Sequence, residues 1–247
     1  MKRFLSIDWD FFINATADER CILFPDGGSE NLPDSIRKYI WDTRYGDPRL
    51  EDIEVDFDAL QYIRKLCRSF CGKCLITESH KHAFDFIMEN TTPDEQFEVY
   101  NIDFHHDLYD FGHKRVNCGN WVAKLKEKRP NMKYVWVNRE DSEQLSKDEV
   151  QVVIMQMSFD AFKSRCGDDF QGLTNHLFLC RSDMWSPPHL DVYFRRLVRI
   201  LFSNQSADVK YEQGIEKLRE FEKPTDFSEY QALASLANSV RGAKSKF

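Results

Sequence analysis

The segment from Asn101 to Asp107 carries residues whose types and spacing suit a metal site. Its sequence, Asn-Ile-Asp-Phe-His-His-Asp, places carboxylates at 103 and 107 around an imidazole at 105. An apolar run at 97–103 predicts a strand, so these three side chains leave its carboxyl end at alternate positions. Oxygen ligands with one or two imidazoles suit Mn²⁺, Mg²⁺ or Fe²⁺ better than structural zinc. Taken alone, the pattern fits a metal site and a solvated acidic turn about equally well.

A second pair of carboxylates lies in the apolar amino-terminal segment. Asp8 and Asp10 come at the end of the run Phe-Leu-Ser-Ile, where a strand is predicted over 3–9. Burial of an unpaired carboxylate is costly, so acids in such a segment are normally protonated, paired or bound to a cation. A buried salt bridge is the alternative to a metal site here.

His80 ends a third predicted strand, at 73–78, and opens a predicted helix at 80–89. Strand ends of this kind are where open α/β sheets build binding sites. On its own, His80 fits a helix cap or a core histidine better than a ligand. Together with the two carboxylate clusters it would complete a set of six candidate metal ligands: Asp8, Asp10, His80, Asp103, His105 and Asp107.

These motifs resemble those of the ureohydrolase superfamily of arginases and agmatinases. Its two-manganese site uses a strand-end His, an Asp-x-His-x-Asp motif and a Ser-x-Asp-x-Asp motif. The order here is altered as if by circular permutation, because Ser6-Ile-Asp-Trp-Asp10 comes first. That order, with Arg181-Ser-Asp-Met-Trp-Ser-Pro-Pro188 late in the chain, is similar to the small peptide arginases. The resemblance covers roughly residues 1–195.

The resemblance implies a hydrolase that converts arginine side chains of a precursor peptide to ornithine and releases urea. It implies two Mn²⁺ ions that acidify a bridging water, giving hydroxide that attacks the guanidinium carbon. In the implied ligand scheme Asp103 and Asp8 bridge the ions, His80 and Asp107 complete one site, and His105 and Asp10 complete the other.

The proton shuttle does not transfer from the family to this chain. Arginases use a histidine beyond the Asp-x-His-x-Asp motif, but the equivalent stretch, Asn117-Cys-Gly-Asn-Trp121, has none. His113 and His106 are the nearby imidazoles, and each fits a surface or ligand-supporting role better than a shuttle. His113 and Asn120 are kept as candidate catalytic residues.

The substrate guanidinium needs a carboxylate, preferably one that accepts two parallel hydrogen bonds. Asp183 is the favoured candidate, because it follows a predicted strand at 176–181 at the same sheet edge; a loop cap is its alternative. Trp185 could wall the alkyl part of an arginine side chain. Glu78 is a weaker candidate for substrate binding.

Two other classes of function stay open. The run Phe-Leu-Ser-Ile-Asp8-Trp-Asp10 also resembles the first motif of haloacid-dehalogenase-type phosphatases, in which the first Asp is a nucleophile and the second an acid/base. Residue 12 is Phe, where that motif has Thr or Val, and the cluster at 103–107 would have no task. A metal-binding protein without catalysis is the third hypothesis, supported by the missing shuttle histidine.

Composition narrows the function classes further. The net charge of -7 comes without a basic stripe, which argues against nucleic-acid binding. No apolar run is long enough to span a membrane, and Asp8 interrupts any signal-like segment, so a cytoplasmic protein is expected. Seven cysteines indicate reduced thiols. The spacing of Cys67, Cys71 and Cys74 fits core packing better than zinc.

Strand and helix patterns alternate along the chain, which predicts a three-layer α/β/α fold with a mostly parallel sheet, as in a permuted arginase/deacetylase-like domain. Strands are predicted at 3–9, 73–78, 97–103, 133–138, 151–157 and 176–181. Helices are predicted near 57–70, 80–89, 119–128, 190–203 and 209–221.

The predicted catalytic domain covers 1–204 and contains a long irregular insertion at 13–56. The insertion fits a peptide platform, with Trp41, Arg44 and Tyr45 as possible contacts, as well as a decorative loop. Residues 205–247 are expected to form a helical appendage, with a weakly amphipathic segment at 228–240. The oligomeric state is left open.

Overall fold

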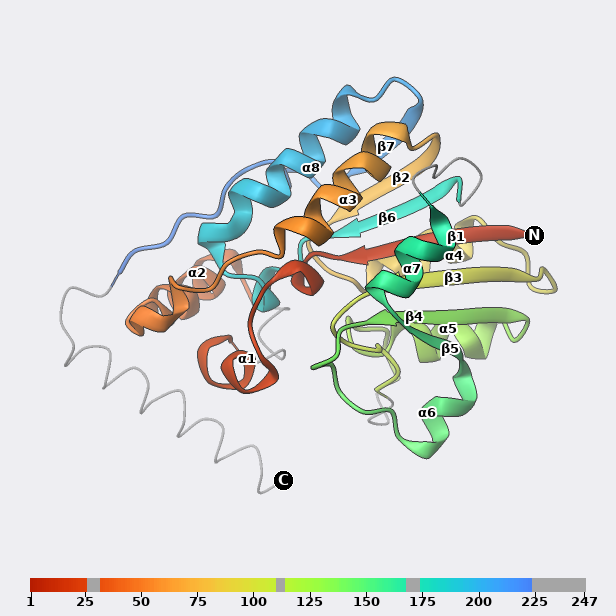
Figure 1. Cartoon of the computed structure of the whole chain (residues 1–247), viewed down its shortest axis with the longest axis horizontal. Helices are drawn as coiled ribbons and strands as arrows, with labels where there is room; N and C mark the ends of the chain where they lie inside the picture. Colours follow the sequence, from red (N-terminus) through yellow and green to blue (C-terminus); the bar gives the residue numbers. More distant parts are fainter. Residues whose placement is uncertain (26–31, 110–113, 168–173, 224–247) are drawn as a thin grey trace.

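The computed structural model describes residues 1–25, 32–109, 114–167 and 174–223 (Figure 1). The strands of this part are β1 (Lys2–Asp8), β2 (Gly72–Thr77), β3 (Phe97–Ile102), β4 (Met132–Asn138), β5 (Val153–Ser158), β6 (His176–Cys180) and β7 (Ala207–Tyr211). The α-helices are α1 (Ala17–Leu23), α2 (Asp34–Arg44), α3 (Phe57–Ser69), α4 (His82–Glu89), α5 (Trp121–Lys128), α6 (Lys147–Val152), α7 (Phe159–Cys166) and α8 (Asp191–Ser203). Short 3₁₀ turns include η1 (Trp9–Phe12), η3 (Pro48–Leu50), η4 (Asp183–Trp185) and η5 (Pro188–Leu190).

The strands form one parallel sheet in the order β5-β4-β3-β1-β6-β2-β7. From β1 the chain first reaches β2 on one side and then β3 on the other, so the strand order reverses at β1. Open α/β sheets bind ligands outside the carboxyl ends of the strands at such a point. The register keeps these ends level, because Asp8 lies opposite Cys180 and Cys180 lies opposite Thr77.

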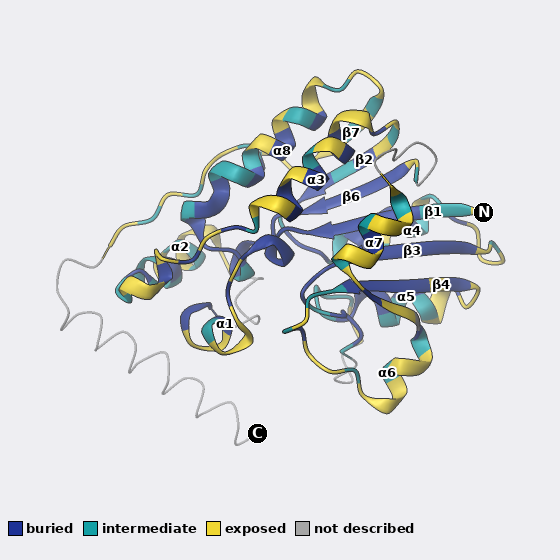
Figure 2. Cartoon of the chain, viewed as in Figure 1, coloured by how far each residue is buried: buried dark blue, intermediate teal, exposed yellow. Residues whose placement is uncertain are grey.

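Helices cover both faces of the sheet, which confirms the predicted three-layer α/β/α fold. Helices α3, α7 and α8 lie on one face, and α4 and α5 lie on the other (Figure 1). Two separate hydrophobic clusters fill the space between the layers. The central strands are buried on both sides, as Figure 2 shows in dark blue, which explains their nearly continuous apolar sequences.

All six predicted strands are confirmed, with ends that differ by at most two residues. Four of the predicted helices correspond to α3, α4, α5 and α8. None of the described helices is long and apolar enough to cross a bilayer.

The sequence predicted an irregular insertion at 13–56. The structure shows instead that this segment contains α1, α2 and η3. Trp41 and Tyr45 were expected as possible contacts for a peptide, but neither is exposed. Trp41 is 1% exposed and Tyr45 is 3% exposed, and both belong to the hydrophobic core. The side chain of Arg44 donates to the carbonyl of Ile22 and so joins the two helices. The insertion therefore packs as part of the domain.

The predicted helix at 209–221 is wrong. Residues 207–211 form β7, which pairs with β2 at the edge of the sheet, and the chain then turns between Gly214 and Lys217. The sheet thus continues beyond residue 204, where the appendage was expected to begin. The amphipathic segment predicted at 228–240 lies outside the described residues.

Candidate metal centre

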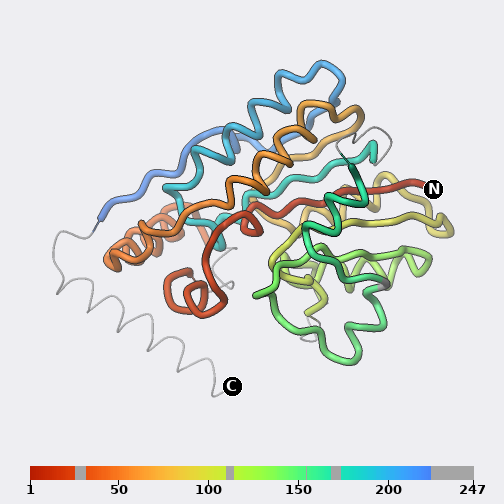
Figure 3. The backbone as a smooth tube through the Cα atoms, in the orientation of Figure 1, coloured from red at the N-terminus to blue at the C-terminus, as the bar shows by residue number. Residues whose placement is uncertain are grey.

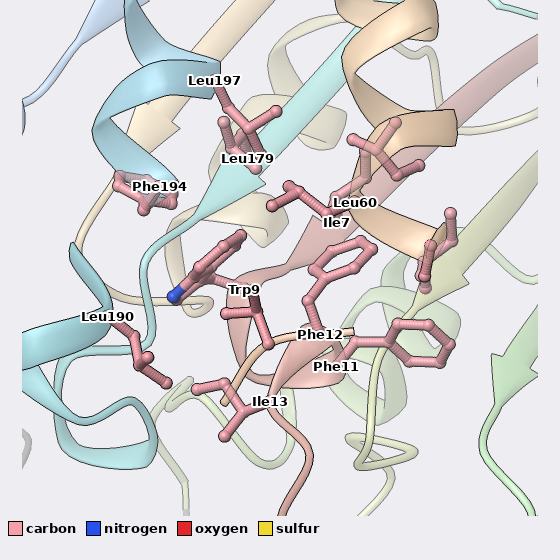
Figure 4. Packing of buried hydrophobic residues seen from close by; sticks show 14 of the residues in the cluster. Ile7, Trp9, Phe11, Phe12, Ile13, Leu60, Leu179, Leu190, Phe194 and Leu197 are labelled. Carbon is pink, nitrogen blue, oxygen red and sulfur yellow. The ribbon is translucent and has the colours of Figure 1, made fainter. Parts of the chain in front are cut away.

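The six candidate ligands meet at the carboxyl edge of the sheet. Asp8 ends β1, Asp103 directly follows β3, and His80 comes three residues after β2. Asp10 lies in η1, whose neighbouring residues Trp9, Phe11 and Phe12 are anchored in the hydrophobic core around β1 (Figure 4). The apolar neighbours fix the turn and leave the Asp10 carboxylate directed toward the other ligands.

Three of the other five residues surround the His80 ring. Its Nδ1 atom lies 3.0 Å from Asp8 Oδ2, 3.2 Å from Asp103 Oδ2 and 3.1 Å from Asp107 Oδ2. Two ligands at right angles around an ion about 2.1 Å away lie roughly 3 Å apart, so this spacing fits one coordination sphere. The ligand atoms that also lie within 4.8 Å of one another are those of Asp8, His80 and Asp103. In the described part of the chain this buried Nδ1 has no partner with hydrogen-bond geometry. One nitrogen cannot satisfy three carboxylates, whereas one cation can.

The second group consists of Asp10, Asp103 and His105. His105 Nδ1 lies 3.1 Å from Asp10 Oδ2 and 3.9 Å from Asp103 Oδ1. Asp10 is fully buried, and among the described residues neither of its carboxylate oxygens has a hydrogen-bond partner. Because an unsatisfied buried carboxylate is strongly unfavourable, this geometry fits a bound cation.

Asp103 belongs to both groups, with Oδ2 toward His80 and Oδ1 toward His105. This arrangement suits a carboxylate that bridges two ions, although Asp103 Oδ1 also accepts the backbone N–H of His105 at 2.9 Å. Asp8 is placed in a similar way, because its Oδ2 faces His80 while its Oδ1 accepts the backbone N–H of Asp10 at 3.0 Å. A second metal contact from either carboxylate would have to compete with such a hydrogen bond.

Several supporting residues escaped the sequence analysis. His80 Nε2 lies 2.6 Å from Ser6 Oγ, a contact that leaves Nδ1 available as a ligand atom. Trp121 Nε1 donates to Asp107 Oδ2 at 2.5 Å, and Ser182 Oγ donates to Asp8 Oδ2 at 2.5 Å. Asn101 Nδ2 donates to Asp103 Oδ2 at 3.0 Å. Two of these four residues could have been found from the sequence. Ser6 is the serine of the Ser-x-Asp-x-Asp motif, and Asn101 lies two residues before Asp103 and so points to the same side of β3.

The backbone is strained at two residues of this centre. Asp107 has φ 54° and Ser182 has φ 52°, in the left-handed region that non-glycine residues rarely adopt. Such a conformation costs of order 1–3 kcal/mol and persists where the surroundings enforce it, most often at functional sites. Here it directs one carboxylate and one hydroxyl at the ligand cluster.

The candidate clamp residues are already paired with arginines of the chain itself. Asp183 Oδ2 lies 2.8 Å from Arg37 Nη1, and its Oδ1 accepts from Arg219 at 2.5 Å. Glu78 forms a two-pronged ion pair with the guanidinium of Arg181. Neither carboxylate is free for a substrate in this arrangement.

Trp185 is the substrate-binding candidate that lies beside the ligands. Its ring centroid is 4.7 Å from that of His105, and the side chain is half-buried. Asn120, in contrast, is occupied by its own loop, since it accepts from the N–H of Asn117 and donates to the carbonyl of Arg115. His113 lies outside the described residues.

His106 supports the loop and does not face the ligand cluster. Its Nδ1 accepts the N–H of Leu108, and its Nε2 lies 3.6 Å from a carboxylate oxygen of Glu149. The ring packs against Tyr109 and Trp136. This environment agrees with the expected supporting role.

A groove of about 700 Å³ lies over α4, β2 and β7, away from these residues. Its charged lining includes Lys73, Asp85, Glu89, Lys210 and Glu212. The six candidate ligands do not line it, so this groove and the candidate chemistry are separate.

Burial raises the pKa of three of the four candidate carboxylates, Asp8, Asp103 and Asp107, whereas His105 and Arg20 hold the pKa of Asp10 below its usual value despite its burial. Burial, with the nearby charge of Asp10 and Asp103, raises the pKa of Asp8 to about 7. Burial and Asp107 likewise raise the pKa of Asp103 to about 7. Burial alone would lower the pKa of His80, but the surrounding carboxylates raise it well above its usual value. Bound metal ions would therefore replace protons.

We expect stabilisation by Mn²⁺ to increase as the pH rises from about 5 to 8. Raised pKa values mean that the metal-free folded state holds extra protons, and the stability they contribute is present below pH 4 and lost as the pH passes 7. Metal affinity should gain roughly tenfold per pH unit for each displaced proton. The measurement is the melting temperature with and without Mn²⁺ across this range. A metal-induced shift that stays constant with pH would contradict proton replacement.

Comparison of the chain with protein-family models, with curated proteins and with solved structures finds no match.

Proposed function

We propose that this protein is a hydrolase with two divalent metal ions that converts arginine side chains of a peptide to ornithine and releases urea. The observation that carries the metal pair is the convergence of two buried ligand groups on Asp103. The donors are carboxylate oxygens and imidazole nitrogens, a set that suits Mn²⁺ and related ions. The choice of arginine as substrate is supported by the resemblance of the three motifs to the ureohydrolases.

Asp8, His80, Asp103 and Asp107 would hold one ion, and Asp10, Asp103 and His105 would hold the other. Two such ions supply an activated water and a positive field at the reacting carbon. The protein orients the ligands through Ser6, Ser182 and Trp121, and their burial keeps bulk water away.

The substrate side chain would lie against Trp185, beside His105. Its half-buried indole offers an apolar face to the methylene groups of an arginine side chain and a π face to its guanidinium. A carboxylate partner is less direct, because Asp183 is bound by Arg37 and Arg219. A substrate guanidinium could reach Asp183 only by displacing one of them, and Arg37, with 17% of its side chain exposed, is the more accessible.

The test is mass spectrometry of an arginine-containing precursor peptide that is co-expressed with the protein in the presence of Mn²⁺. We expect a loss of about 42 Da per converted arginine, the mass change when water adds and urea leaves. A peptide in which lysine replaces each arginine is the matched control and should keep its mass.

Other outcomes separate the remaining hypotheses. A protein with two bound ions that leaves the peptide unchanged but releases urea from agmatine or free arginine would place the substrate among small guanidino compounds. Metal binding without hydrolysis of any guanidino compound would support a non-catalytic role. Phosphatase activity that needs Asp8 and not His105 would support the haloacid-dehalogenase hypothesis, although the shared geometry of these residues argues against it.

A further inference from the structure

Arg20 places a buried positive charge beside the second ligand group. It belongs to α1 of the insertion and is 4% exposed. Its Nη2 donates to the carbonyls of Asp10 at 2.8 Å and Ile13 at 2.9 Å, and its Nε donates to the carbonyl of Ala15 at 3.1 Å. The guanidinium thus fixes the backbone of the turn that carries Asp10.

The remaining nitrogen of Arg20 faces the ligand itself. Nη1 lies 3.7 Å from Asp10 Oδ2, and within the described residues it has no hydrogen-bond partner. A buried N–H without a hydrogen-bond partner is unusual, and here it lies beside a carboxylate whose oxygens also have no described hydrogen bond, so both groups are available to help hold an ion.

Arg20 also contacts the segment that carries the other ligands of this group. Its guanidinium carbon lies 4.0 Å from the ring centroid of Phe104, which stands between Asp103 and His105 in the sequence. One side chain therefore joins η1 to the turn after β3. In Figure 3, α1 is the red coil that follows the carboxyl end of β1.

We propose that Arg20 is a positioning residue for the second metal ion and that it makes loading of this ion depend on the insertion. It holds the Asp10 backbone from one side and Phe104 from the other, so the carboxylate and imidazole are placed before the ion arrives. Residues that orient metal ligands typically contribute 10–100-fold to metal affinity. No described hydrogen bond or ion pair joins Arg20 to Asp8, His80, Asp103 or Asp107, so this group should keep its ion without Arg20.

This inference deepens the proposed function and rests on its pair of ions. The test is calorimetric titration of the metal-free protein with Mn²⁺, compared for wild type, Arg20→Met and Arg20→Lys. Arg129→Met is the matched control, because Arg129 is also buried and donates to the carbonyls of Met88, Thr91 and Lys128. These residues precede β3 and β4, at the opposite end of the strands from the ligands. Electron paramagnetic resonance then distinguishes an isolated Mn²⁺ from a coupled pair.

In Arg20→Met we expect the dissociation constant of the second ion to rise by about 10–100-fold while that of the first changes little. At Mn²⁺ concentrations that give a coupled pair in wild type, this variant should show the signal of isolated ions. Arg20→Lys keeps the charge but cannot make the three carbonyl contacts, so it should lose most of the second-ion affinity as well. Arg129→Met should bind both ions as wild type does.

The possible failures are distinguishable. Wild type that never binds a second ion would overturn the proposed metal pair. Wild type with two ions and Arg20→Met with unchanged affinities would overturn the role of Arg20 alone. Equal weakening of both ions in Arg20→Met would also overturn it, since that result indicates general destabilisation.

Discussion

Replacement of Asp103 by alanine should remove both metal ions and reduce hydrolysis by about 1,000-fold or more. The reason is geometric, because Asp103 directs one oxygen to the His80 group and the other to the His105 group. Either group would keep carboxylate ligands, but neither would keep the shared one. Elemental analysis of the purified variant, with turnover of the peptide, is the measurement.

A matched control for this variant is Glu98→Gln, on β3, the strand that Asp103 follows. Glu98 is 8% exposed and pairs with Arg3, away from the ligand cluster. It should keep wild-type metal content and activity. If the Asp103 variant keeps two ions per chain, the bridging role is wrong. If it retains one ion, Asp103 belongs to a single site.

Replacement of Arg219 by alanine should lower the free energy of unfolding by about 3–5 kcal/mol. Arg219 pairs with Asp183 and Asp191, which are 5% and 1% exposed, and it donates to the carbonyls of Asp183 and Ser186. Burial raises the pKa of Asp183, but Arg219 and Arg37 outweigh that effect and hold it below its usual value. Without Arg219 the carboxylates would stay buried with too few partners.

The measurement is denaturant or thermal unfolding, with an expected fall in melting temperature of roughly 10 °C. Lys223→Ala is the control. Lys223 lies a few residues after Arg219 and forms an exposed ion pair with Glu51. Exposed pairs of this kind contribute at most about 1 kcal/mol. Equal stability of the Arg219 variant and wild type would show that Asp183 is satisfied in another way, which would reopen its use as a substrate clamp.

The sheet and the ligand cluster could be predicted because both depend on local patterns. Parallel strands buried on two faces give apolar runs, and side chains at their carboxyl ends meet at one edge. Strand β7 escaped prediction because its sequence, Ala-Asp-Val-Lys-Tyr, is polar and mostly exposed at the edge of the sheet. Helices α1 and α2 escaped because they interrupt a segment rich in Gly, Pro and Asp.

The state of Asp183 could not be predicted, for a different reason. It follows β6 as expected, although it lies in the 3₁₀ turn η4 and not in a loop. Its partners Arg37 and Arg219 lie far away in sequence on both sides. The same holds for Arg20 and Asp10, which meet only because α1 folds back over the end of β1. Pairing of charges across the fold depends on tertiary structure, which no local spacing reveals.

The first ligand group draws Asp8, His80 and Asp103 from the ends of three strands that are widely separated along the chain. An ion held there acts as a cross-link between these segments, comparable in its effect to a disulfide that closes two long loops. An unfolded chain that kept the ion would have to keep the two loops between Asp8, His80 and Asp103 closed, which lowers its conformational entropy. The ion must therefore leave before the centre of the sheet can open. The rate of unfolding would then be limited by metal release, and the ion needed for chemistry would also determine how long the folded protein lasts.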